Sequence, residues 1–477
     1  MKTFEQLVQK AVVAPTLEER MTLALDAAKF AEFHPTGYYA SPKIEGIFLE
    51  AAATLPDVKC APQKNTVLHV MTQAYTSGGH TRVVQRWMDL SKTNEKHDVV
   101  LLNQEKEEVP GWLEVTALKH KGSVIRIDES DILKRAAKLR ELAAKYEHII
   151  LHIHMDDPTA IIALGVESFT TPVIFFNHAD HMFWLGVSIA DVVADMRFDH
   201  ISYIHRNVRK SYVLGIPCSD KKAMDKVDKT AIRQELGIPE KDFVIITTGT
   251  AFKYTRLGSN SLCMQFIDIV NNGGNVSCYA IGPDKNCDPW QKATDATNGK
   301  IRPLGIIKDK ALYQKYLSSA DLYMGSYPYP SYTATIEAVQ CGMPYLQLLV
   351  TPHQDFDLRI TPTVDIARCT CHTTVDLVKM ALNVIRNKQE YEKTLNTSIR
   401  WVEEYANSEQ WQKRLYEMYE ECPKVHTVYS FTIKRGKHVQ IDDNDCMIGL
   451  LHDKENFEFK NRFMRRLAHG WMRMKGV

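Results

Sequence analysis

The chain has 477 residues, a formal net charge of +1, 44% hydrophobic residues and 25% charged residues. This balance is that of an ordinary soluble globular protein, and it excludes a global electrostatic attraction to nucleic acid. Because 477 residues exceed what one hydrophobic core usually supports, we expect two domains with appendages.

The cysteines and the N-terminal residues indicate the compartment. The ten cysteines are scattered, and the close pair Cys369 and Cys371 has no second pair at zinc-site spacing. The first residues include acidic side chains and no apolar core of signal-peptide length, and no run reaches about 18 apolar residues. We therefore expect a cytoplasmic protein with reduced thiols that does not span a membrane.

Residues 1–64 have the apolar spacing of helices, with Leu17, Met21 and Leu25 on one stripe. The segment ends in a connector that contains Pro56. We expect a helical N-terminal extension that is not a catalytic unit.

From residue 65 the pattern changes to short apolar runs separated by helical segments. The runs in residues 65–217 are TVLHVMT, HDVVLLN, SVIRI, HIILHIH, PVIFFNH and HISYIH. The runs in residues 218–421 are FVIITTG, VSCYAIG, DLYMGS, PYLQLLV and DIARCTC, closed by a long helical stretch from Asp376 to Glu421. This alternation predicts two α/β domains, each with a parallel sheet flanked by helices.

Residues 422–477 form a C-terminal extension whose segment VHTVYSFTIKRGKHVQI predicts a hairpin turning at Arg435–Gly436. Residues 459–475 predict a basic amphipathic helix, because Phe463 and Trp471 share a stripe that is surrounded by Lys and Arg. Such a helix binds an anionic membrane surface, or packs on the domains or on a partner protein. Nucleic acid is the least favoured partner.

Two consecutive open α/β domains imply a cleft with ligands at the carboxyl ends of the strands. The stretch DLYMGSYPYPSYTATIEAVQCGMPYLQLLV reads as a strand end, a loop, a helix beginning near Thr333 and a second strand. Unpaired N–H groups and the helix dipole at such a helix start favour phosphate. One turn further, Glu337 is placed to accept hydrogen bonds from a ribose diol. The predicted donor-binding residues here are Tyr332, Thr333, Ala334, Thr335 and Glu337.

A purely structural role is the alternative for the same stretch. Thr333 would then cap a structural helix, and Glu337 would only complement the helix dipole. Strand, loop and helix units of this kind recur in all doubly wound proteins. The choice between a ligand site and a structural unit therefore depends on motifs elsewhere in the chain.

The first strand of the first domain leads into TSGGHTRVV, where Gly78 and Gly79 allow a tight turn and close approach to a ligand. The spacing is not GxGxxG, so no dinucleotide site is inferred. His80 and Arg82, at the start of the following helix, are candidates for contact with acceptor or phosphate. The alternative is a structural strand-to-helix turn.

The fifth run ends in FFNHADH, where His178, Asp180 and His181 crowd together directly after a buried strand. Two histidines and a carboxylate could supply a general base or recognise sugar hydroxyls. A third metal ligand is lacking nearby, so no metal site is predicted. The alternative is that each histidine is bonded to a neighbouring loop.

In the second domain the first run leads into TTGTAFKYTR, where Gly249 and Thr250 make the turn. Lys253 and Arg256 bring cations to the end of a strand, where a diphosphate would need them. The alternative is that these are solvated surface side chains.

The layout from about residue 65 to residue 421 resembles the glycosyltransferases of the GT-B fold, which have two facing Rossmann-like domains. SGGHTRVV is similar to their glycine-rich first loop, and PYPSYTATIEAVQCGMP is similar to their donor-binding signature. The resemblance implies a nucleotide-sugar bound mainly by the second domain, with phosphate at Thr333–Thr335 and ribose at Glu337.

The retaining subgroup of that family has two glutamates separated by seven residues, and Tyr329 stands where the first would be. The combination of FKYTR with YTATIE is somewhat closer to the inverting protein O-GlcNAc transferase group, in which a lysine binds the diphosphate. The resemblance thus implies that Lys253 stabilises the leaving nucleotide without a metal or cofactor, with a UDP-sugar as donor. The stereochemical outcome stays open.

We predict a cytoplasmic glycosyltransferase, held at the inner face of the membrane if residues 459–475 bind lipid. It would transfer a sugar from a nucleotide-diphosphate sugar to an unidentified acceptor, such as a cell-envelope glycan, a lipid or a protein. One rival is a nucleotide-sugar epimerase or hydrolase of the same fold, which would convert the donor with no acceptor present. The other is a non-catalytic scaffold that binds a nucleotide-sugar.

Overall fold

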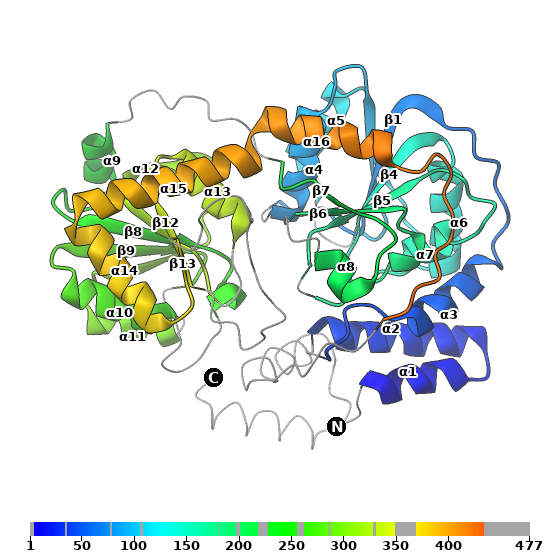
Figure 1. Ribbon diagram of the computed structural model, residues 1–477, viewed down its shortest axis with the longest axis horizontal. Helices are drawn as coiled ribbons and strands as arrows, with labels where there is room; N and C mark the ends of the chain where they lie inside the picture. The colour runs from blue at the N-terminus through cyan, green and yellow to red at the C-terminus, as the bar shows by residue number, and fades with distance from the viewer. Residues whose placement is uncertain are drawn as a thin grey trace. The chain divides into compact units, whose positions relative to one another are not determined.

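The computed structural model describes residues 4–33, 36–76, 79–104, 108–180, 182–196, 201–217, 228–254, 262–284, 286, 288–327, 331–348 and 369–433. The chain divides into two compact units: unit 1 is Met1–Pro217 with Trp411–Val477, and unit 2 is Cys218–Gln410. Each unit contains a parallel sheet with helices packed on it (Figure 1). The predicted α/β class with two Rossmann-like domains is confirmed.

Unit 1 contains a seven-stranded sheet in the order β3-β2-β1-β4-β5-β6-β7. Its strands are β1 (Gln63–Met71), β2 (Lys96–Leu101), β3 (Val124–Arg126), β4 (Tyr146–His152), β5 (Val173–Asn177), β6 (Val192–Asp195) and β7 (Ser211–Val213). Its helices are α1 (Phe4–Val13), α2 (Leu17–Phe33), α3 (Pro42–Ala52), α4 (Gly79–Leu90), α5 (Gly111–Lys119), α6 (Ile132–Ala143), α7 (Thr159–Leu164), the short 3-10 helix η1 (Val187–Ile189), α8 (Ile201–Arg206) and most of α16 (Ser408–Glu421).

Unit 2 contains a six-stranded sheet in the order β10-β9-β8-β11-β12-β13. Its strands are β8 (Phe243–Thr248), β9 (Val276–Ile281), β10 (Ile301–Gly305), β11 (Leu322–Met324), β12 (Tyr345–Leu348) and β13 (Thr370–Cys371). Its helices are α9 (Lys229–Leu236), the 3-10 helix η2 (Ala251–Tyr254), α10 (Leu262–Asn272), α11 (Asp288–Ala296), α12 (Lys310–Ser319), α13 (Tyr332–Gln340), α14 (Thr374–Arg386) and α15 (Lys388–Ala406).

The strand order places a topological switch point in each sheet. In unit 1 the chain proceeds outward in one direction from β1 and in the other from β4, and in unit 2 the same reversal separates β8 from β11. In open α/β sheets the connecting loops diverge at such a point, so ligands bind there, outside the carboxyl ends of the strands. The loops after β1, β4, β8 and β11 are therefore where each unit would bind a ligand.

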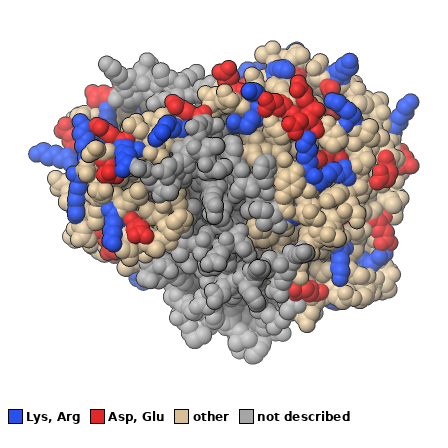
Figure 2. Space-filling model, viewed as in Figure 1, with Lys and Arg blue, Asp and Glu red and all other residues tan. Residues whose placement is uncertain are grey.

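The central strands are buried on both faces, as parallel strands require. Leu68 and Val70 of β1 pack in one apolar cluster, whereas Met71 packs with Val99 and Leu101 in the cluster on the opposite face. On the face drawn in Figure 2, Lys and Arg side chains alternate with Asp and Glu over the described surface, in keeping with the net charge of +1.

Several predicted elements differ from the structure. The run HISYIH was expected as a strand and is the helix α8, while β6, β7 and β10 have no counterpart among the predicted runs. A six-residue apolar run has too little length to distinguish a strand from a buried helix turn. The long helical stretch to Glu421 is three helices, because Asn387 ends α14 and its side chain caps α15 by accepting from the N–H groups of Gln389 and Glu390.

The predicted C-terminal hairpin turn at Arg435–Gly436 and the basic helix at residues 459–475 lie outside the described residues. The described part of that extension, residues 422–433, has no assigned strand and packs on unit 1 through His426, whose Nδ1 lies 2.7 Å from Asp191 Oδ2. Across the described ranges, no helix combines the length and apolar character that crossing a bilayer requires.

The N-terminal helices α1–α3 belong to the core of unit 1. Phe4, Ile44 and Phe48 are buried in the same apolar cluster as the sheet, and α3 packs beside α7 (Figure 1). Arg140 of α6 fixes this arrangement, because its buried guanidinium donates to the carbonyl oxygens of Ala52, Leu55, Pro56, Ile162 and Ala163. Ala52 ends α3, Leu55 and Pro56 follow it, and Ile162 and Ala163 lie in the last turn of α7, so Arg140 joins the ends of the two helices.

A row of three buried histidines crosses the opposite face of the unit 1 sheet. His97 Nδ1 lies 3.1 Å from His69 Nε2, and His69 Nδ1 lies 3.1 Å from His152 Nε2. His97 Nε2 lies 3.4 Å from the Glu95 carboxylate, which can only accept. In each of the two bridges to His69 one ring donates and the other accepts, and burial holds the pKa of His69 and of His152 well below the usual range.

We predict that Arg140→Met destabilises unit 1 by at least about 3 kcal/mol, because it leaves buried carbonyl oxygens without donors while keeping the apolar stem. Hydrogen exchange of the β1 and β4 amides in increasing urea measures this loss within unit 1. The matched control is Lys138→Met on the same helix, whose exposed ammonium pairs only with Glu129 and whose loss should cost under about 0.5 kcal/mol. Equal stability of the two variants would contradict the role given to Arg140.

Candidate functional site

The carboxyl edge of unit 2 brings the two predicted halves of the donor site together. A Cβ added to Gly249, after β8, would lie 3.1 Å from Ser331 Oγ and 3.3 Å from Ser326 Cβ, after β11. Ser326 Oγ and Ser331 Oγ are 3.0 Å apart. The turn that follows β8 therefore lies directly against the loop that leads into α13, at the switch point of the sheet.

Two further glycines make this close approach possible. Gly282, after β9, has φ of +114°, and a Cβ there would lie 1.8 Å from the carbonyl oxygen of Gly249. A Cβ on Gly325, after β11, would lie 1.8 Å from Gln347 Oε1. A side chain at Gly282 would collide with the main chain that follows β8, and one at Gly325 would displace the Gln347 amide.

The N-terminus of α13 has the features of an anion site. Its N-cap residue is Ser331, whose side chain makes no capping hydrogen bond because its Oγ is paired with Ser326. Thr333 and Ala334, both half-buried, occupy the first turn, where N–H groups have no partner within the helix. The helix does not begin at Thr333, so the alternative in which that residue caps it is wrong.

Two predicted donor residues of α13 have specific partners. Thr335 is buried, and its hydroxyl donates to the carbonyl oxygen of Ser331 (3.2 Å), so it faces the protein. Glu337 is half-buried and its Oε2 accepts from the Tyr313 hydroxyl of α12 at 3.5 Å. Burial, with the Glu337 carboxyl next to it, raises the pKa of Tyr313 well above its usual value. The tyrosine thus stays a donor that orients the carboxylate.

Lys253 lies in η2, which directly follows Gly249 and the exposed Thr250. The next residue, Tyr254, anchors this turn in the core, where its hydroxyl lies 2.9 Å from Thr247 Oγ1. Burial lowers the pKa of Lys253 to about 8. A nearby anion would stabilise the charged form and restore the usual pKa. Arg256 and the side chain of Tyr332 lie outside the described residues.

The carboxyl edge of unit 1 gathers imidazole rings from three loops. The rings of His80 and His178 have centroids 4.4 Å apart, and those of His80 and His154 are 6.2 Å apart. These residues follow β1, β5 and β4. Gly79 opens α4 immediately before His80, and the structure therefore unites two loops that the sequence suggested separately.

Hydrogen bonds fix the tautomers of this cluster. His80 Nε2 donates to the carbonyl oxygen of His152 (2.8 Å), which leaves Nδ1 as the ring's acceptor. The Tyr75 hydroxyl donates to Gln73 Oε1 (2.6 Å) and accepts from His154 Nε2 (3.1 Å). Burial, then the neighbouring His178 and His154, hold the pKa of His80 well below its usual value. The imidazole of His80 is therefore held in its neutral form.

The other predicted residues of this edge have less suitable surroundings. The ring of His178 is half-buried, and its Nδ1 lies 3.3 Å from the carbonyl oxygen of Phe176. Asp180 is 4% exposed, and its carbonyl oxygen accepts from Arg206. The guanidinium carbon of Arg82 lies 3.6 Å from the centroid of the Trp112 ring. Because the side chain is engaged there, it is a less suitable ligand for phosphate than predicted. Gly78 and His181 lie outside the described residues.

Four residues of these edges were missed by sequence reasoning: Tyr75, His154, Tyr313 and Gln347. Tyr75 and His154 stand at strand ends, which was a usable signal, since strand ends at a switch point converge. Tyr313 lies inside a helix 24 residues before Glu337, and nothing in their spacing predicts contact. Gln347 Nε2 donates to the carbonyl oxygens of Ser326 and Leu348, a role that depends on the packed strands.

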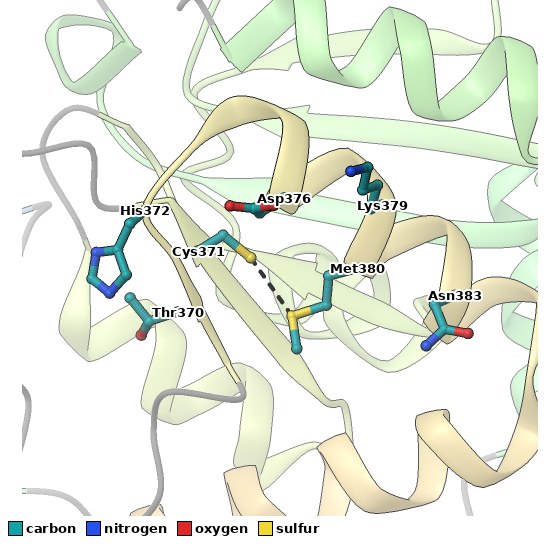
Figure 3. Close-up of a pocket in the computed structure, with 7 residues that line it drawn as sticks. All are labelled: Thr370, Cys371, His372, Asp376, Lys379, Met380 and Asn383. Atoms are coloured by element: carbon teal, nitrogen blue, oxygen red, sulfur yellow. Dashed lines mark hydrogen bonds between the residues drawn. The ribbon is translucent and has the colours of Figure 1, made fainter.

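A separate surface pocket of about 580 Å³ lies between β13 and α14 (Figure 3). It is lined by Thr370, Cys371, His372, Asp376, Lys379, Met380 and Asn383. Cys371 Sγ points at Met380 Sδ (3.6 Å), and burial raises the pKa of its thiol to about 12, so it is no nucleophile. In the part of the chain that the structure describes, no three His, Cys, Asp or Glu side chains are grouped to hold a metal ion.

No family model and no curated protein matches the sequence. Solved structures do match. A mutant of the O-GlcNAc transferase from Thermobaculum terrenum has 11% identity and a TM-score of 0.52, covering 88% of this chain and 84% of that one. HepE from Anabaena, in complex with UDP and glucose, has 14% identity and a TM-score of 0.51, covering 75% and 99%.

A glycosyltransferase from Rickettsia africae has 10% identity and a TM-score of 0.55, covering 76% of this chain and 99% of that one. At such identities the likeness concerns the arrangement of the main chain, and each match spans both parallel sheets of this chain. The two switch-point edges described above are features of the same architecture. The chain has the GT-B fold.

Proposed function

We propose that the protein is a glycosyltransferase that moves a sugar from a nucleotide-diphosphate sugar, with UDP as the nucleotide, to an acceptor hydroxyl. The fold supports this proposal, since the similar structures include HepE in complex with UDP and glucose, and with UDP-glucose. Fold alone does not define a reaction, so the proposal depends on the site.

The observation that carries the proposal is the uncapped N-terminus of α13 lying against Gly249. Glycosyl transfer leaves negative charge on the departing diphosphate, and fixed N–H donors stabilise that charge without reorganisation. A glycine opposite the helix start lets a diphosphate approach main chain on both sides. Phosphate groups are the ligands that such a helix start most often binds.

Lys253 would supply the cation of the donor site. It follows the Gly249 turn in η2, and its lowered pKa indicates that the ammonium is poorly solvated. A diphosphate would restore the favourable surroundings of the charge, and the charge would stabilise the leaving nucleotide. We propose that Lys253 and the helix start perform this task without a metal ion.

Glu337 would hold the ribose, and Tyr313 would orient it. A carboxylate one turn into the helix is repelled by phosphate but accepts well from a vicinal diol. Tyr313 donates to Oε2 and so fixes the orientation of the carboxylate that would accept from the ribose diol. The phosphates at the helix start and the ribose one turn further fit the length of one nucleotide.

On the acceptor side we propose an imidazole base, with His80 favoured over the predicted His178, Asp180 and His181. The Nε2–H of His80 is held by the carbonyl of His152, so the lone pair of Nδ1 is available to an acceptor hydroxyl. Its low pKa keeps it neutral at pH 7. Asp180 is disfavoured because it is nearly fully buried.

The binding proposal is tested by thermal unfolding with UDP, UDP-glucose, UDP-N-acetylglucosamine, GDP-mannose and ADP-glucose, each with and without EDTA. We expect one nucleotide class to raise Tm, since a ligand at 100 times its Kd stabilises by about 2.7 kcal/mol, and we expect EDTA to change nothing. No shift with any compound contradicts the proposal. Conversion of the donor with no acceptor present favours the epimerase or hydrolase, and binding without any conversion favours the scaffold.

Lys253→Ala is expected to weaken UDP binding and turnover about 10- to 100-fold with little loss of Tm, because a charged hydrogen bond to phosphate is removed. The pKa of about 8 sets a pH dependence: the ammonium is present below pH 8 and lost above it, so UDP affinity should fall between pH 8 and pH 9.5. Lys253→Arg should remove that fall, because its guanidinium stays charged over this pH range. Calorimetric titration measures the UDP affinity of each variant and its dependence on pH, and Lys292→Ala, at an exposed lysine of α11, is the control. Normal turnover in Lys253→Ala removes the lysine from the mechanism.

Glu337→Ala is expected to abolish the preference for UDP over 2′-deoxy-UDP, which in the wild type should be about tenfold because one hydrogen bond to a charged acceptor is lost. Tyr313→Phe is the matched control, since it keeps the carboxylate and removes only its partner, and it should keep most of the preference. Should Glu337→Ala weaken both nucleotides equally, the carboxylate only complements the helix dipole.

A further inference from the structure

The loop after β5, residues 178–188, carries the predicted acceptor-side residues His178 and Asp180 and ends in η1. The helices α1–α3 form an N-terminal layer on unit 1, and Glu45 lies on α3. Its carboxylate accepts from three consecutive main-chain N–H groups at the C-terminal end of this loop. Its Oε1 accepts from Gly186 (3.0 Å) and Val187 (3.1 Å), and its Oε2 accepts from Ser188 (2.7 Å). The carboxylate thus caps η1 from a segment more than 140 residues earlier in the chain.

The residues around this contact restrict the conformation of the loop. Glu45 is fully buried, and Gly186 has φ of +127°, with the ring of Phe175 at 3.1 Å from where a Cβ would be. A carboxylate in such a place is stable only while its hydrogen bonds are made, so the three N–H groups and Glu45 depend on one another. Burial raises the pKa of Glu45, and the hydrogen bonds act against that rise.

Other contacts also hold the loop against the N-terminal layer. The main-chain N–H of Trp184 donates to the carbonyl oxygen of Tyr39 (3.2 Å), and the ring of Phe4 meets that of Phe183 edge-on with 5.8 Å between the centroids. Trp184 stacks on Phe175 of β5 at 4.0 Å between centroids. The loop is therefore held at main chain and side chain by residues that precede the first strand of the sheet.

We propose that the N-terminal layer is part of the acceptor-side site and that Glu45 is a positioning residue, which fixes the loop carrying His178 beside His80. This inference rests on the proposed function. It replaces the expectation that residues 1–64 are an extension apart from catalysis. A displacement of about 1 Å at a reacting group can cost about 100-fold in rate, so a support of this kind matters to turnover.

The test uses Glu45→Gln in the full chain, which keeps the size of the side chain but turns an NH2 group toward an N–H donor. The matched control is Glu50→Gln on the same helix, where the carboxylate pairs with Arg20 and touches no part of the loop. Phe4→Leu is the second variant, because it loosens the loop through packing if Glu45→Gln folds poorly. Hydrogen exchange of peptides within 178–188, UDP affinity, and turnover of the UDP-sugar selected by thermal unfolding are measured.

We expect Glu45→Gln to raise exchange in the loop and lower kcat at least about tenfold, with UDP affinity within about twofold of the wild type, because the donor site is built in unit 2. Phe4→Leu should do the same to a smaller degree, and Glu50→Gln should do neither. Unchanged exchange, or raised exchange with normal kcat, overturns the positioning role. A wild-type chain that binds no UDP and releases none overturns the proposed function instead, a result seen before any variant is made.

Discussion

The close approach of the chain at the carboxyl ends of β8, β9 and β11 is the constraint on which the proposed donor site depends. Parallel strands that diverge at a switch point leave their last N–H groups and the following loops without ladder partners. Gly282 lets the chain after β9 approach the main chain of Gly249, while Gly249 and Gly325 leave room for the side chains of Ser326, Ser331 and Gln347. The start of α13 then lies where a charged ligand can reach main-chain donors, and the chemistry proposed for the site follows from that packing.

Unit 1 is organised by buried charges that satisfy main-chain groups. Arg140 donates to the carbonyl ends of α3 and α7, and Glu45 accepts from the N–H groups that open η1. Each side chain joins the N-terminal layer to a part of the sheet domain that is distant in sequence. Such charges contribute specificity of arrangement, because removing either partner leaves a buried polar group without compensation. The layer and the sheet therefore fold as one core.

The alternation of short apolar runs with helical segments was enough to predict two parallel α/β domains, and the segments around Gly249 and Ser331, predicted to share a donor site, lie against each other in the structure. Short elements were not predicted correctly. The strand β10 was missed because it contains Pro303, and the run that forms α8 is too short for its periodicity to distinguish a helix from a strand. Glu45, Arg140 and Tyr313 could not be foreseen as site or support residues, since their partners are fixed only by tertiary packing. Fold followed from local pattern, whereas the supports of the site followed from contacts between distant segments.

The histidine row of unit 1 has a consequence for how the protein meets acid. Each of the two bridges, His152–His69 and His69–His97, already holds one proton and one lone pair, so an extra proton in a bridge would break that link. Both partners of a broken link are enclosed by Trp87 and the strands, where a bare imidazolium is poorly tolerated. The unfolded chain, whose imidazoles titrate normally near pH 6.5, takes up those protons freely. Because the folded protein holds the pKa of His69 and His152 well below that range, acidification below about pH 6.5 favours the unfolded chain.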